Sequence, residues 1–150
     1  MKTWSSQLDH GRTPRGLSLV EMLVALTIIG VLTSMALPSF QRAVDQSRAD
    51  IAGANLRAIW SAERVYWLDN RTYTSNLSQL ESLGLLDPTI VSASTFYVYA
   101  IPLADSGSFT ATATRTGSAR WSGQFTIDET GVMAGAVTAT GELVIEPGFQ

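Results

Sequence analysis

The chain has 150 residues, which is enough for one small domain beside a membrane segment, so no second globular domain is expected. Its formal net charge is −3. Because residues 1–16 hold three basic side chains and one acidic side chain, the rest of the chain carries −5. An acidic surface opposes phosphate binding, which depends on clustered Lys and Arg, so no nucleic-acid partner is expected.

Few side chains suited to catalysis are present. Cysteine is absent, the only histidine is His10, and from residue 17 onward there are seven arginines and no lysine. That part of the chain therefore lacks the groups that form a nucleophile–base pair or a nitrogen or sulfur metal site. Asp128 and Glu129 are adjacent, which indicates an acidic turn, because neighbours in a strand point to opposite faces. We expect no enzyme activity, no cofactor and no metal.

An uncharged run of 19 residues, 22–40, directly follows Glu21. A helix of about 20 residues crosses a hydrocarbon core of about 30 Å, so this run can span a membrane. It suits a signal anchor whose basic residues in 1–16 stay in the cytoplasm, or a removable signal peptide cut near residues 34–36. Neither interpretation explains Glu21, because a charge in the apolar part of a membrane helix costs about 2–3 kcal/mol.

Cleavage between Gly16 and Leu17 would explain the glutamate. The new amino group of Leu17 would stand at the first helical position, and Glu21 lies four residues further on the same face. A positive charge would then be available to meet the carboxylate.

The sequence Gly16-Leu17-Ser18-Leu19-Val20-Glu21, followed by an apolar run, resembles the class III leader of type IV pilins and of the related type II secretion pseudopilins. The resemblance implies that a prepilin peptidase cuts after Gly16 and methylates the Leu17 amine. It also implies that Glu21 acts in assembly of a helical filament. The family's first mature residue is usually Phe, and Thr is frequent at the next position, so Leu17 and Ser18 are mild departures.

Gly30 and Pro38 match the helix-weakening glycine and proline of the same family in identity and in distance from the cut. Glycine weakens a helix by about 1 kcal/mol and proline by about 3 kcal/mol, so the stretch between them could unwind on assembly. Gly30 would equally allow close helix packing in a membrane. Pro38 would equally mark the point where the helix leaves the bilayer.

The helical pattern continues beyond the apolar run. If residues 17–69 form one helix, 53 residues at about 1.5 Å each make a rod of roughly 80 Å. Asp45 with Arg42 or Arg48 has a spacing that permits ion pairs. Four aromatic residues near its end are expected to be core: Trp60, Tyr66, Trp67 and Tyr73. The apolar positions of this amphipathic half are Val44, Ile51, Ala54, Ala58, Ala62 and Val65.

The remainder changes from helical to strand-like periodicity. Residues 78–84 predict a short surface helix, with a capping box of Ser78 and Glu81 and a terminal glycine. Antiparallel strands are predicted by alternation, turn residues and β-branched or aromatic side chains. They cover residues 95–101, 108–116 and 121–128, while 132–137 is ambiguous and 142–146 could add a short edge strand.

These observations predict an α+β fold with a long N-terminal α-helix packed on a small antiparallel sheet. The expected division is a cleaved leader (1–16), a transmembrane or filament-core helix (17–40) and a periplasmic or extracellular domain (41–150). The absence of cysteine excludes the disulfide-bounded C-terminal loop that many major pilins carry, which favours a minor or specialised subunit.

The expected function is that of a non-catalytic pilus-type filament subunit, with a secretion pseudopilin or a membrane-anchored adhesin as alternatives. The expected partners are copies of itself or sister pilins, prepilin peptidase, the inner-membrane assembly machinery, and lipid before assembly. The chain would lie in the inner membrane first, then in an extracellular pilus or periplasmic pseudopilus.

Overall fold

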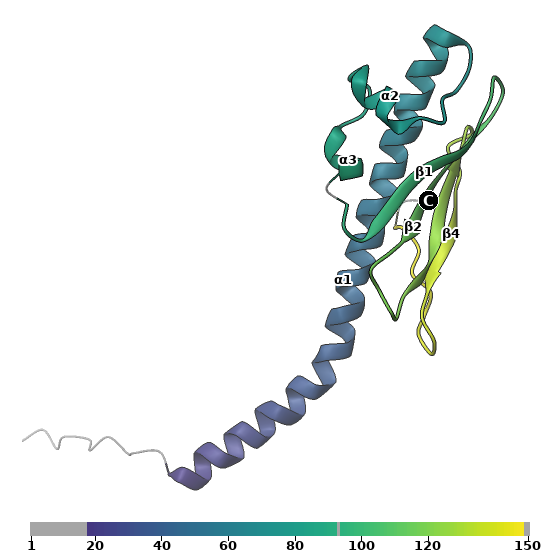
Figure 1. Cartoon of the computed structure of the whole chain (residues 1–150). Coiled ribbons are helices and arrows are strands. Elements are labelled where there is room, and N and C mark those ends of the chain that lie inside the picture. Colours follow the sequence, from purple (N-terminus) through teal and green to yellow (C-terminus); the bar gives the residue numbers. More distant parts are fainter. Residues whose placement is uncertain (1–17, 93, 149–150) are drawn as a thin grey trace, which may run out of the picture. The chain divides into compact units, whose positions relative to one another are not determined.

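The computed structural model describes residues 18–92 and 94–148, without the side chains of residues 35–38. The chain divides between Ser39 and Phe40 into two compact units, unit 1 and unit 2 (Figure 1). Helix α1, Leu19–Asn70, runs through both. Its end at Asn70 agrees with the turn-rich sequence that follows, and Arg71 adopts a left-handed φ of 57° there.

Unit 2 contains a four-stranded antiparallel sheet in the order β1-β2-β3-β4 (Figure 1). The strands are β1 (Tyr97–Ala104), β2 (Phe109–Arg115), β3 (Ser122–Asp128) and β4 (Met133–Thr138). The ambiguous segment 132–137 is thus a strand. The edge strand expected at 142–146 is wrong: Ile145 forms only a single bridge with Val137. The chain reaches that bridge through a turn at Gly141, whose φ is +76°, so the pairing extends no further.

One face of α1 packs on the sheet, and we call it the inner stripe. Its members are spaced three or four residues apart and are all buried: Ala49, Ala52, Leu56, Ile59, Glu63 and Tyr66. Ala62 is also buried, as its periodicity predicts. Ile51 and Val65, taken from sequence as part of the same apolar pattern, are instead 58% and 43% exposed. The helix carries two apolar faces, and the single sheet formed by the described residues covers one of them.

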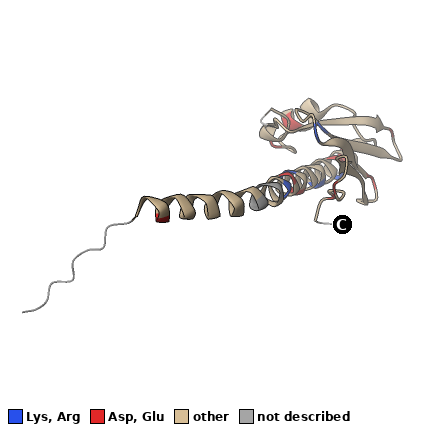
Figure 2. Ribbon diagram, turned by 90° about the horizontal axis from the view of Figure 1, so that it is seen from below, with Lys and Arg blue, Asp and Glu red and all other residues tan. Residues whose placement is uncertain are grey.

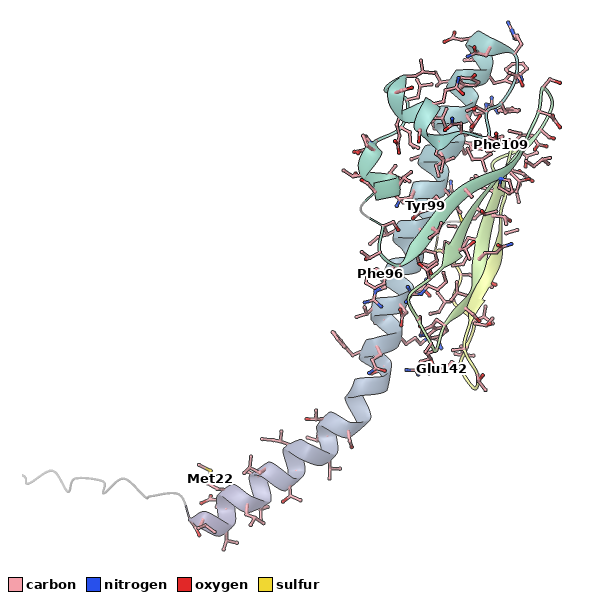
Figure 3. The ribbon with its side chains drawn as sticks, in the orientation of Figure 1. Met22, Phe96, Tyr99, Phe109 and Glu142 are labelled. Carbon is pink, nitrogen blue, oxygen red and sulfur yellow. The ribbon has the colours of Figure 1, made fainter. Side chains whose placement is uncertain are left out.

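The sheet meets the inner stripe with the side chains that alternate inward along its strands. Phe109, Ala111 and Ala113 of β2 are fully buried, while the intervening threonines face outward, as alternation predicts. Tyr99 of β1 reaches α1, where its hydroxyl accepts a hydrogen bond from Asn55 at 2.9 Å (Figure 3). Of the four aromatic residues expected in the core, Tyr66 is buried in it and Trp60 and Tyr73 are partly buried against it. Trp67 is half-buried and lies outside the core cluster.

Two short helices connect α1 to the sheet. The predicted capping box is wrong, because Ser78 lies inside α2 (Leu77–Ser82) and the Asn76 side chain caps the helix by accepting from the Ser78 amide. The terminal Gly84 has the expected left-handed φ, +70°. Helix α3 (Pro88–Ser92) was not expected. It begins where the Asp87 side chain accepts from the Thr89 amide at 2.8 Å.

The inner stripe includes one carboxyl side chain, Glu63, which is fully buried beneath the loop that follows α1. Its Oε2 atom accepts a hydrogen bond from the Thr74 amide at 3.0 Å, whereas Oε1 has no hydrogen-bond partner among the described residues. Burial raises the pKa of Glu63 to about 7, and the Thr74 hydrogen bond lowers it in part. The loop therefore rests on a carboxyl group that titrates near neutral pH.

Glu63 should make stability depend on pH. Its pKa of about 7 in the folded chain exceeds the ordinary 4.5, so the folded chain binds this proton more tightly than the unfolded chain. The free energy of unfolding should be highest below pH 4.5, fall by about 2–3 kcal/mol as the pH rises to 7, and then level off. Urea unfolding of the full chain in neutral detergent across this range measures the fall.

The Glu63→Gln variant should show a nearly flat curve over the same range. Asp105 and Asp128 do not interfere, because hydrogen bonds within their turns lower their pKa below 3.8, and they destabilise the fold only in more acidic solution. Parallel pH curves for the variant and the parent chain would contradict the titration of Glu63.

Candidate functional site

The residues expected to act in processing and assembly all belong to unit 1. Gly16 and Leu17, on either side of the expected cut, lie outside the described residues. Glu21 lies in the first turn of α1 and is exposed. The backbone is helical at both Gly30 and Pro38, so neither residue interrupts α1 in the single chain.

The described part of unit 1 is apolar on every side. Its segment of α1 is long and hydrophobic enough to cross a membrane, with a mean hydropathy of 2.1, and Glu21 is its only charged residue (Figure 2). Figure 3 shows Met22 and its neighbours projecting all around the helix. The exposed large side chains are Leu19, Val20, Met22, Leu23, Val24, Leu26, Ile28, Ile29, Val31 and Leu32. A helix that is apolar all round requires lipid or protein around it.

Three hydroxyl groups in this segment form hydrogen bonds within the helix. The hydroxyls of Thr27 and Thr33 donate to the carbonyls four residues earlier, at 2.6 and 2.7 Å, and Ser34 donates to the Val31 carbonyl at 2.7 Å. Hydroxyls paired in this way can enter hydrocarbon at low cost. A Cβ atom added at Gly30 would meet nothing within 4 Å, so nothing in the single chain requires glycine there.

On unit 2, α1 carries a second apolar stripe on the side opposite the inner stripe, which we call the seam. Its members alternate in steps of four and three, the spacing with which one helix packs on another. Leu68 is 62% exposed, and the described residues of unit 2 leave most of the seam uncovered. The seam consists of Phe40, Val44, Ser47, Ile51, Ala54, Ala58, Ser61, Val65 and Leu68.

One carboxylate near the beginning of unit 2 holds two arginines. Asp45 Oδ1 accepts hydrogen bonds from Arg48 and Arg115, each at 2.9 Å. The Arg115 side chain is only 3% exposed, and it also donates to the Phe96 carbonyl at 3.1 Å. The Arg48 guanidinium lies 3.8 Å from the centre of the Phe96 ring. This network fastens α1 to β2 and to the segment entering β1.

A third face of α1 alternates arginine with tryptophan, and Arg71 follows directly after the helix; we call this set the Arg–Trp stripe. The Trp60 indole donates to the Glu129 carbonyl at 3.1 Å, and the Trp67 indole donates to the Ser106 carbonyl at 2.9 Å. These carbonyls belong to the β3–β4 and β1–β2 turns, so both hairpins reach this face. The stripe consists of Arg57, Trp60, Arg64, Trp67 and Arg71.

Sequence reasoning missed the significance of both surfaces. The seam was visible as an apolar repeat in steps of three and four, but it was not separated from the inner stripe. Arg57, Arg64 and Arg71 recur every seven residues, which places them on one face of a helix. Neither surface offers a nucleophile with its base, and the described residues contain no group of three His, Cys, Asp or Glu placed to hold a metal ion. The surfaces suit association.

Two family models match the chain in succession. The model described as a prokaryotic N-terminal methylation motif matches residues 11–37. The model described as type IV minor pilin ComP, DNA uptake sequence receptor, matches residues 38–125.

Several curated proteins are similar to the chain. The type IV wide pilus major component PilA4 of Thermus thermophilus is 32% identical over 74 residues, 49% of this chain and 56% of that protein. The type II secretion system core protein G of Pseudomonas aeruginosa is 33% identical over 72 residues, 48% of this chain and 51% of that protein. The type IV major pilin protein PilA of Myxococcus xanthus is 27% identical over 66 residues, 44% of this chain and 30% of that protein.

The chain thus spans about half the length of the first two relatives and less of the third. Their names belong to pilins and to a secretion-system core protein, and none names an enzyme. The methylation motif matches residues in the apolar first unit, and the second model matches residues in the helix-and-sheet unit. Because the second model covers more than half of its residues, the chain belongs to the family of type IV pilins which that model describes.

Proposed function

We propose that the chain is a structural subunit of a type IV pilus-type filament and has no catalytic activity of its own. Two apolar surfaces of α1 carry this proposal: the part of the helix that lies in unit 1, and the seam in unit 2. The described residues leave most of both surfaces exposed. Exposure of such surfaces to water is unfavourable by about 25 cal/mol per Å², and a soluble monomer rarely keeps them bare. Inner-membrane lipid covers unit 1 before assembly, and neighbouring subunits cover both surfaces in the filament.

Processing precedes assembly in this proposal. A prepilin peptidase cuts between Gly16 and Leu17 and methylates the Leu17 amine, which the matched methylation motif supports. Residues 17–40 then form the membrane and filament-core segment, and residues 41–150 form the periplasmic or extracellular domain. The Leu17 amine of an incoming subunit meets the Glu21 carboxylate of a neighbour, and this pairing of opposite charges in an apolar core sets their register.

The segment between Gly30 and Pro38 is the proposed place of unwinding during assembly. Backbone groups left unpaired in hydrocarbon cost several kcal/mol each, so the segment stays helical in lipid. Neighbouring subunits in a filament can bury and satisfy those groups. Unbroken helical density across these residues in a filament reconstruction would exclude unwinding without affecting the filament proposal.

The proposed filament includes both a pilus and a secretion pseudopilus, because the similar proteins include pilins and a secretion-system core protein. The inner-membrane assembly machinery serves either form. Cross-linking on whole cells distinguishes the roles of the subunit: a ladder of self-adducts supports a major subunit, and one defined adduct with another pilin supports a minor subunit.

DNA binding is a second candidate function. The description of the matching family names a DNA uptake sequence receptor. The acidic net charge opposes this function, but Arg57 and Arg64 share one face of α1 and Arg71 follows directly after the helix, so arginines are concentrated locally. Retention of a labelled DNA duplex by the purified full chain tests it.

The mature chain should begin at Leu17. Gly16 gives the peptidase an unhindered site, and Glu21 needs the amine that the cut releases. Mass spectrometry of the N-terminal peptide from membranes should find Leu17, carrying one added methyl group. An N-terminus at Leu37 would instead establish an ordinary signal peptide.

The Glu21→Val variant should be inserted and cut normally but should enter filaments poorly. Cleavage depends on Gly16, whereas register depends on the carboxylate, whose loss leaves the neighbour's Leu17 amine unpaired in an apolar core. Subunits that begin at Leu17 should be as abundant as normal in membranes and reduced at least about tenfold in sheared filaments, a loss equivalent to about 1.4 kcal/mol. Undiminished incorporation would show that Glu21 serves only its own amine.

Within unit 2, the Ile51→Glu variant should block assembly without unfolding the domain. Ile51 is 58% exposed in the single chain, so stability should change by less than about 0.5 kcal/mol. In a filament the substitution would bury a carboxylate in the seam, which costs several kcal/mol. Incorporation into sheared filaments and thermal unfolding measure the two effects. The matched control is Leu143→Glu, an exposed apolar position outside the seam, and equal incorporation of both variants would contradict a role for the seam.

A further inference from the structure

Three segments of unit 2 meet where the chain leaves the apolar run. The Arg120 guanidinium joins two of them to each other, because it donates to Gln41 Oε1 at 2.9 Å and forms an ion pair with Glu142. Arg42 reaches the same C-terminal segment and donates to the Val144 carbonyl at 3.4 Å. We call this part of unit 2 the basal end, and it consists of residues 40–42, 119–120 and 142–144.

The basal end exposes large apolar side chains. Among the described residues, Leu143 is 73% exposed, Phe40 is 68% exposed and Val144 is 48% exposed. The two arginines beside them, Arg42 and Arg120, already bond to other groups of unit 2. Exposed apolar side chains that gather at one end of a domain are typical of a protein or membrane contact. Apolar contact is therefore the main interaction that the basal end can offer.

The position of Phe40 in the chain relates the basal end to a membrane. Phe40 is the last residue of the uncharged run and the first residue of unit 2. From Glu21 to Phe40 the helix rises about 28 Å, close to the ~30 Å of a hydrocarbon core. If Glu21 stands at one boundary of the core, Phe40 stands at the other. Bonds to Gln41 and Arg42 hold the other two segments beside that same boundary.

We propose that the basal end is an interfacial anchor that inserts Leu143 and Val144, together with Phe40, among phospholipid headgroups before assembly. The inference rests on the proposed function, in which inner-membrane lipid surrounds unit 1. A bilayer already lies beside this end in every inserted subunit, whereas a second protein must first be recruited. The added contact limits how far unit 2 can tilt or rotate above the membrane. Phe40 also begins the seam, so it exchanges lipid for a neighbouring subunit when a filament forms.

Fluorescent labels at two ends of unit 2 test the anchor. The chain has no cysteine, so a single introduced cysteine is labelled uniquely. Suitable exposed positions are Ala119→Cys at the basal end and Ser106→Cys in the turn that bonds to Trp67. Figure 3 shows Glu142 and Phe109, which follows that turn, at opposite ends of unit 2. In vesicles of zwitterionic phospholipid, a nitroxide on the headgroups should quench the label at position 119 at least about threefold more strongly, because position 67 lies about 40 Å further along α1.

Removal of the anchoring side chains should move the basal end away from lipid. In the Leu143→Ser/Val144→Ser variant of the full chain, quenching at position 119 should fall about twofold or more, because less apolar surface is left to insert. The matched control is Leu103→Ser/Val132→Ser, which removes the same two side chains from exposed positions near the hairpin turns. Its quenching should equal that of the parent chain, and thermal unfolding confirms that each variant is folded. Equal quenching in the parent chain and in the Leu143→Ser/Val144→Ser variant would overturn the anchor.

A third label separates the anchor from the proposed function. With Ile28→Cys, quenching by a nitroxide on the lipid acyl chains shows that α1 spans the bilayer, and its absence would overturn both proposals. Quenching at position 28 without any at position 119 would overturn the anchor alone. Quenching at position 119 that requires anionic lipid and is lost in high salt would assign the contact to the arginines, against an apolar anchor. Reduced filament incorporation of the Leu143→Ser/Val144→Ser variant with unchanged quenching would make the basal end a subunit contact and likewise overturn the proposal.

Discussion

Burial of the inner stripe against the sheet determines the direction of every other surface on unit 2. Leu56 and Ile59 of α1 are fully buried against a core that includes Phe109 and Phe125 of the strands. Rotation of α1 by one residue, about 100°, would replace these contacts with arginines or with the seam. With the inner face fixed, the seam must face away from the sheet and the Arg–Trp stripe must lie beside the hairpin turns. The surface proposed for assembly is therefore a consequence of one packing interaction.

Unit 1 is under a different constraint, because its segment of α1 is not covered by a sheet. Between Glu21 and Arg42 the chain has no charged side chain, and the hydroxyl groups of Thr27, Thr33 and Ser34 bond to the helix's own carbonyls. Such a segment is compatible with lipid and with tight packing among helices, but not with water. Charged residues begin at Arg42, the third residue of unit 2. One continuous helix is thus divided between two environments by composition alone.

Much of the fold could be predicted from sequence because the local signals were strong. The long helix, its end at Asn70, three strands and the turn at Asp128 follow from periodicity and turn chemistry. The buried Glu63 could not be predicted, since its burial depends on the distant Thr74 amide and the covering loop. The division of the apolar positions into seam and inner stripe was also beyond sequence reasoning, because alanines occur on both. Asn76, rather than Ser78, caps α2 because the tertiary position of the loop decides where the helix begins.

The sequence has no cysteine, and hydrogen bonds and packing hold the C-terminal end of the described chain in place. Ile145 pairs with Val137, the Glu146 carbonyl accepts from Gln46 at 2.7 Å, and the Gly148 amide donates to Asp50 at 2.8 Å. The Pro147 ring lies so close to Gly53 that a Cβ atom added there would approach it to 2.8 Å. Individually such hydrogen bonds contribute about 1 kcal/mol, but together they attach the segment to β4 and to α1 at several points. Hydrogen bonds of this kind open and close reversibly, whereas a disulfide opens only on reduction. The C-terminal segment therefore stays ordered only while α1 is packed in place.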